Sequence, residues 1–154
     1  MILAMTAADQ HVSSAAIASV EEQFTILYTR VRAGMRDRAS RVHPELQPLG
    51  FTVLATLLRC GPTHAGAMAE RLDLDKSMMS RQVRQLEGMG LITRESDPND
   101  RRAAYLVATA DAQTRVAAVR RADQKSLHAG LADWQLGDLE KLVELLERLN
   151  SLSE

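Results

Sequence analysis

Near the start of the chain, apolar residues recur at steps of three and four. This period predicts a long amphipathic helix over residues 16–43, which should end before Pro44 because the residue preceding a proline avoids the helical conformation. The apolar stripe consists of Ile17, Val20, Phe24, Leu27 and Val31. Residues 1–15 are rich in alanine and serine and lack an apolar period, so we expect a flexible tail there.

Two shorter helices are expected next. Pro48 suits the first turn of a helix, and the Gly61-Pro62 pair ends that helix. Thr63 is placed to cap a third helix, which would run through Leu72.

A fourth helix follows the third after only a few residues. Asp75 is placed to cap it, and its amphipathic pattern continues from Lys76 to about Met89. Two helices joined by so tight a turn predict a helix-turn-helix. The turn residue Asp73 stands where glycine would fit most easily.

A hairpin is expected after Gly90, which closes the fourth helix. Residues 91–94 and 104–107 read as two strands, and residues 97–100 form a turn between them. Thr109 starts another helix through about Leu131, and a last helix carries a leucine-rich stripe over residues 136–149. The predicted fold class is therefore mainly α with a small β-hairpin wing (α+β).

Composition indicates one compact domain. The chain has 154 residues, of which 45% are hydrophobic, enough for a core without disulfides or a structural metal. Cys60 is the only cysteine, and the N-terminus lacks the features of a secretory signal, so we expect a reducing cytoplasm. The apolar run at residues 1–5 is too short to span a membrane.

Charge is unevenly distributed along the chain. Residues 30–41 hold five arginines and one acid, whereas residues 133–154 hold six acids and two basic residues. The formal net charge of −1 argues against indiscriminate coating of nucleic acid. A protein that reads one site needs positive charge only on its contact face.

The polar side of the fourth helix carries residue types that read DNA. Arginine can donate two hydrogen bonds to guanine, and serine can donate or accept at several base edges. The candidate residues are Lys76, Ser77, Ser80, Arg81 and Arg84. The alternative is that these residues form an ordinary solvated helix face. The adjacent tight turn and hairpin favour a face that contacts DNA.

The tip of the hairpin adds two cations. Arg101 and Arg102 could reach phosphates or a narrow minor groove, and Asp100 could brace one of them. A charged, solvated turn is the alternative.

The run from Ala69 to Val107, AERLDLDKSMMSRQVRQLEGMGLITRESDPNDRRAAYLV, resembles the DNA-binding core of MarR-type regulators. The resemblance implies that the fourth helix is a recognition helix whose Ser77, Ser80, Arg81 and Arg84 face the major groove. It also implies that residues 97–102 form a wing, from which Arg102, oriented by Asp100, enters the minor groove.

More loosely, the resemblance implies one MarR-like domain over residues 16–154. Its winged helix-turn-helix would occupy residues 48–108, approximately, with dimerisation helices at about 16–43 and 109–152. A homodimer on a palindromic operator is expected, since a second copy would cover the apolar stripes of the first and last helices. Packing of the two stripes on each other within one chain is the alternative.

Members of the family are commonly repressors that a small phenolic or anionic ligand releases from DNA, so the resemblance implies such an effector. Tyr28, Arg32, Arg38 and His43 are considered as lining residues, with surface or interface roles favoured. A redox-responsive regulator acting through Cys60 and a winged helix that binds protein are the alternative functions. The sequence carries no motif of an enzyme, a metal site or a cofactor site.

Overall fold

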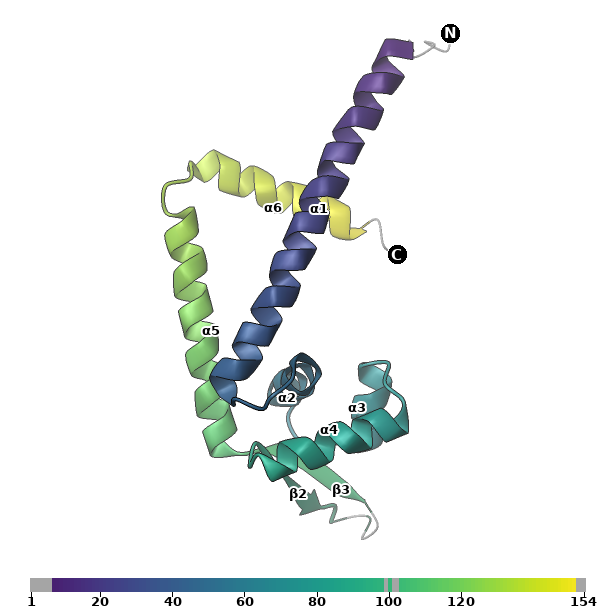
Figure 1. Ribbon diagram of the computed structural model, residues 1–154, viewed down its shortest axis with the longest axis vertical. Coiled ribbons are helices and arrows are strands. Elements are labelled where there is room, and N and C mark those ends of the chain that lie inside the picture. The colour runs from purple at the N-terminus through teal and green to yellow at the C-terminus, as the bar shows by residue number, and fades with distance from the viewer. Residues whose placement is uncertain (1–6, 99, 101–102, 152–154) are drawn as a thin grey trace. The chain divides into compact units, whose positions relative to one another are not determined.

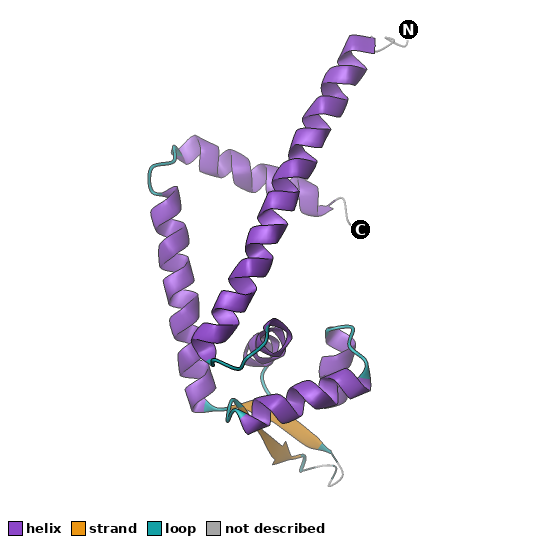
Figure 2. Ribbon diagram, in the orientation of Figure 1, coloured by secondary structure: helices purple, strands orange, loops and turns teal. Residues whose placement is uncertain are grey.

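The computed structural model describes residues 7–98, 100 and 103–151, which form helices and a small sheet (Figures 1 and 2). The chain divides into two compact units, Met1–Val116 and Ala117–Glu154. In chain order the elements are α1 (Ala7–Val42), α2 (Pro48–Cys60), β1 (Thr63–His64), α3 (Ala65–Arg71), α4 (Lys76–Gly88), β2 (Ile92–Ser96), β3 (Ala104–Ala108), α5 (Ala110–Leu131) and α6 (Leu136–Asn150).

Helix α1 begins earlier than the sequence pattern predicts. The expectation of a flexible tail over residues 1–15 is wrong for residues 7–15, which are helical, and residues 1–6 lie outside the described part of the chain. Residues 7–15 hold three alanines with no glycine or proline, so intrinsic propensity favours the helix without an apolar stripe. The helix ends at Val42, before His43-Pro44, as predicted.

The core of the first unit is formed by α2, α3, α4 and the sheet. Helix α2 packs against α1, α4 and β3. Among the largest fully buried side chains are Leu54, Leu57, Met68, Met79, Leu86, Leu91 and Leu106. This burial holds α4 with its apolar side inward and its polar side in solvent.

The sheet has three strands in the described residues, one more than predicted. Its order is β1-β3-β2, all antiparallel, and β2 and β3 lie side by side in Figure 1. Thr63 lies in β1 and pairs with Leu106 of β3, so its predicted role as the cap of α3 is wrong. The Thr63 hydroxyl donates instead to the Gly61 carbonyl at 2.8 Å, and His64 precedes α3. A β-branched residue suits the strand, and a two-residue strand leaves no period to detect.

The turn between α3 and α4 depends on a left-handed backbone at Asp73, whose φ is +51°. The Leu74 amide donates to the Ala69 carbonyl at 2.9 Å, and this bond closes the turn. Aspartate tolerates the left-handed region better than most residues do, which explains how the turn forms without glycine.

Substitutions at Asp73 test this turn. Asp73→Gly should leave the free energy of unfolding unchanged or slightly raised, whereas Asp73→Val should lower it by about 1–2 kcal/mol because a branched Cβ clashes in this conformation. Urea denaturation followed by circular dichroism measures both. Equal losses for the two variants would contradict the assigned backbone conformation.

The second unit contains the end of α5 and all of α6. Helix α5 begins in the first unit next to Thr109, close to its predicted start, and the Thr109 hydroxyl accepts from the Ala112 amide at 3.2 Å. Helix α6 has no buried residue, and its exposed apolar side chains include Leu142 and Leu146. Within the described residues, no helix combines the length and apolar character needed to cross a bilayer.

Candidate nucleic-acid interface

The first turn of α4 is held by Asp75. Its carboxylate accepts from the Met78 amide at 2.8 Å and from the Ser77 hydroxyl at 2.6 Å. The Ser77 bond, followed by the Met78 bond, lowers the pKa of Asp75 below its usual range. The predicted cap is thus confirmed, and Ser77 uses its proton to support it, which leaves its oxygen as an acceptor.

The cap gives a testable pH dependence. Because the pKa of Asp75 is lowered in the folded chain, its stabilising effect is present above the unfolded-state pKa and is lost as pH falls through the folded-state value. Asp75→Ala should lower the melting temperature at neutral pH by about 3 °C and by less in acid. Calorimetry at both pH values checks this, and an equal loss at both would contradict the charged cap.

The five candidate residues of α4 share one exposed surface. Met79, Val83 and Leu86 are buried on the other side, so the predicted amphipathic division is observed. The exposed residues are Lys76, Ser77, Ser80, Arg81 and Arg84. We call this surface the α4 face.

Arg84 lies along the α4 face one turn beyond Ser80. Its Nη2 donates to Ser80 Oγ at 3.3 Å and its Nε donates to the Ser80 carbonyl at 3.4 Å. Bonds of this length on an exposed surface are weak. The guanidinium can therefore exchange them for a stronger acceptor without leaving a buried group unpaired.

The far end of α4 is tied to the sheet by an ion pair that sequence reasoning missed. Arg94 of β2 donates to both carboxylate oxygens of Glu87, at 2.7 Å and 3.3 Å. Such bidentate geometry fixes orientation as well as distance. Glu87 and Arg94 are seven residues apart, with a helix end and a turn between them. No sequence spacing predicts an ion pair across such a segment, so the contact is evident only in the folded structure.

The hairpin tip is partly described. The Asp97 amide donates to the Ala103 carbonyl at 3.2 Å, and the Ala103 amide donates to the Asp100 carbonyl at 3.0 Å. Asp100 is exposed. Arg101 and Arg102 lie outside the described residues, so their contacts with DNA and the bracing by Asp100 remain predictions.

A second cluster missed by sequence reasoning lies at the base of the hairpin. His64 Nε2 is 3.1 Å from the Asp97 carboxylate, and the His64 ring stacks on Tyr105 with centroids 4.1 Å apart. The negative charge of Asp97, with desolvation and a hydrogen bond to it, raises the pKa of Tyr105 above its usual range. The cluster depends on the register of β1 against β3, which no local pattern reveals.

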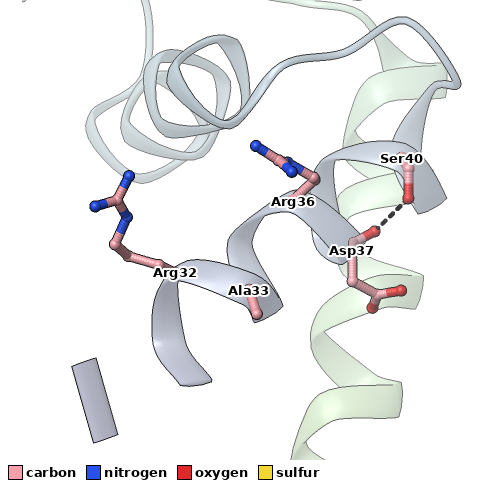
Figure 3. A pocket seen from close by; sticks show the side chains of 5 residues that line it. All are labelled: Arg32, Ala33, Arg36, Asp37 and Ser40. Atoms are coloured by element: carbon pink, nitrogen blue, oxygen red, sulfur yellow. Dashed lines mark hydrogen bonds between the residues drawn. The ribbon is translucent and has the colours of Figure 1, made fainter. Parts of the chain in front are cut away.

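A pocket lies along α1 within the first unit. It is lined by Arg32, Ala33, Arg36, Asp37 and Ser40 and has a volume of about 510 Å³. Figure 3 shows the Arg32 and Arg36 side chains extending to the same side of α1, away from Asp37. The Arg32 guanidinium also lies 5.8 Å from the centre of the Tyr28 ring. Two adjacent cations beside an aromatic ring suit an anionic group.

Candidate metal ligands and the single cysteine can be located in the described part of the chain. No group of three or more histidine, cysteine, aspartate or glutamate side chains is arranged there to hold a metal. Cys60 is an exposed free thiol at the end of α2.

A short turn, a capped helix with a polar outer face and a three-stranded sheet define a winged helix-turn-helix protein. The sequence profile of the MarR family matches residues 46–104. An uncharacterized HTH-type transcriptional regulator, YxaD of Bacillus subtilis (strain 168), is 30% identical over 119 residues, which is 77% of this chain and 83% of that protein. The chain belongs to the MarR family of DNA-binding transcriptional regulators.

Other comparisons agree with this assignment. A putative transcriptional regulatory protein for the hcr operon of Thauera aromatica is 38% identical over 89 residues, covering 55% of this chain and 53% of that protein. The structure of a MarR family transcription regulator, SP03579, superposes with a TM-score of 0.77 at 16% identity over 94% of each chain. Streptococcus pneumoniae FabT, solved in complex with DNA, has a TM-score of 0.77 at 12% identity over 88% of this chain and 96% of that one. The structural likenesses confirm the predicted fold class.

Proposed function

We propose that this chain reads a specific double-stranded DNA sequence through the α4 face and the wing. The observation that carries the proposal is the exposed α4 face, whose helix is held by the Asp75 cap at one end and by Glu87–Arg94 at the other. A helix fixed at both ends presents arginine donors and serine hydroxyl groups at defined spacing to base edges. Lys76, Ser77, Ser80, Arg81 and Arg84 contact the major groove. Arg101 and Arg102 contact the minor groove or its phosphates, and Asp100 orients Arg102.

The protein binds a palindromic operator as a homodimer. Exposed apolar residues on α1 and α6 support this assembly, because covering them with a second copy gains about 25 cal/mol per Å² of apolar area. These residues are Ile17, Val20, Phe24, Leu27 and Val31 on α1, and Leu136, Leu142, Val143, Leu145, Leu146 and Leu149 on α6. A two-fold dimer then matches half-sites about 34–36 Å apart.

The regulator represses transcription in the cytoplasm without catalysis, and a small phenolic or anionic ligand releases it from its operator. The pocket of Arg32 and Arg36 supports an anionic effector, since guanidinium groups form strong hydrogen bonds to carboxylates. The adjacent Tyr28 ring suits an aromatic portion of the ligand.

Redox control through Cys60 is the second candidate, supported by the exposure of its thiol. Its place at the C-terminus of α2 argues against it, because the helix dipole there disfavours a thiolate. Peroxide that abolishes DNA binding by the wild type but not by Cys60→Ser would favour this candidate over the ligand.

Fluorescence anisotropy with a labelled duplex tests the DNA-binding proposal. Affinity should fall by orders of magnitude between about 50 and 200 mM salt and should exceed that for a scrambled duplex of equal length. Phenolic acids added to the complex should lower the anisotropy. Equal affinity for both duplexes would instead support a winged helix that binds protein.

A further inference from the structure

The cluster at the base of the wing joins it to the helix-turn-helix. His64 is the residue immediately before α3, the first helix of that motif, and pairs with Tyr105 of β3. Asp97 follows β2 and is only 8% exposed. The side chain of His64 is 37% exposed, so its ring is open to protons from solvent.

Both ring nitrogens of His64 face hydrogen-bond acceptors. Nε2 is 3.1 Å from Asp97 Oδ2, and Nδ1 is 3.2 Å from the Ala104 carbonyl oxygen. A neutral imidazole has one N–H donor, so it can satisfy only one of these two acceptors. The imidazolium has two donors and can satisfy both, and its positive charge lies against a buried carboxylate.

Several charged or titratable groups lie on the elements around the ring. Tyr105 is stacked on His64, and the negative charge of Asp97 raises the pKa of its hydroxyl above its usual range. Glu95 of β2 lies opposite Tyr105 on the same face of the sheet and adds a negative charge. Helix α3, which packs against β1, carries Glu70 and Arg71 in its last turn, at the end away from His64.

We propose that His64 is a positioning residue for the wing, and that its protonated form ties Asp97 and Ala104 to β1 so that DNA affinity depends on pH. This inference rests on the proposed contact between the wing and DNA. Histidine is the side chain whose charge normally changes between about pH 5 and 8. The protonated ring therefore makes both hydrogen bonds, and deprotonation removes one of the two.

DNA affinity across this range provides the first test. Binding of the wild type to its selected duplex should weaken by about threefold to fivefold from pH 6 to pH 8, the size expected of a partly exposed ion pair. His64→Gln and Asp97→Asn should each remove most of this dependence. His128→Gln, which changes an exposed histidine of α5, should keep the wild-type dependence.

A purely structural role for His64 would give a different result. In that case His64→Gln would weaken binding by the same factor at every pH, and the wild-type slope would persist in the variant. That outcome would overturn the inference. Asp97→Asn guards against a folding defect at one site, because the two variants alter different segments of the chain.

A measurement without DNA separates this inference from the proposed function. Hydrogen exchange of the Asp97 and Ala103 amides, corrected for intrinsic rates, should show greater protection at pH 6 than at pH 8 in the wild type, with no such change in His64→Gln. If this difference appears but no duplex is bound, the DNA-binding proposal fails and the role of His64 in holding the wing stands. If a duplex is bound and protection does not change, only the role of His64 fails.

Discussion

Arg84→Ala is expected to weaken binding to the selected operator by about tenfold to a hundredfold, while changing affinity for unrelated duplexes little. Arg84 is exposed on the α4 face and is held only by long hydrogen bonds to Ser80, so it can donate to a base at small cost. Competition binding with operators changed at single positions measures the effect. The Arg84→Ala variant should distinguish less well between bases at particular positions of the operator.

The wing arginine should behave differently. Arg102→Ala is expected to lower affinity for most duplexes alike, because a phosphate contact is lost. The slope of the logarithm of affinity against the logarithm of salt concentration should become shallower by about one unit. Arg120→Ala, which removes an exposed arginine from α5, is the control and should change neither quantity. Unchanged binding in both Arg84→Ala and Arg102→Ala would contradict the assigned interface.

Leu146→Glu should abolish the homodimer and lower operator affinity by about a hundredfold or more, since each half-site would then bind alone. Leu146 is 43% exposed on α6, in a helix with no buried residue. A charge buried between two copies would lack a partner, which strongly opposes association. Sedimentation velocity measures the mass, and the wild type should sediment as a dimer.

A charge on the opposite side of α6 provides the control. Gly137→Glu adds the same charge where a side chain meets no atom within 4 Å. This variant should remain dimeric. A monomeric wild type, or a dimer that survives Leu146→Glu and Leu142→Glu, would refute an interface built on this stripe.

The sequence predicted the helices and the hairpin well because their signals are local. Apolar period, the Asp75 cap and the Gly61-Pro62 stop each act within a few residues, and they located α2, α4 and α6 closely. The start of α1 was missed because alanine propensity leaves no apolar stripe. Strand β1 was missed because its two residues are defined by pairing with β3 alone.

The candidate site likewise has one part that the sequence could predict and another that it could not. The α4 face could be predicted because helical geometry alone brings its five residues together. The Glu87–Arg94 pair and the His64–Asp97 contact join residues from different elements, so they depend on tertiary packing and strand register. These two contacts hold the end of α4 and the base of the hairpin, and neither leaves a local pattern in the sequence.

Selection of bound sequences from a random duplex pool, by purified protein at near-physiological salt, tests the central claim most directly. The account predicts enrichment of a palindrome whose half-sites lie about one helical turn apart. Weak binding with no enriched sequence would contradict direct reading of DNA by the α4 face.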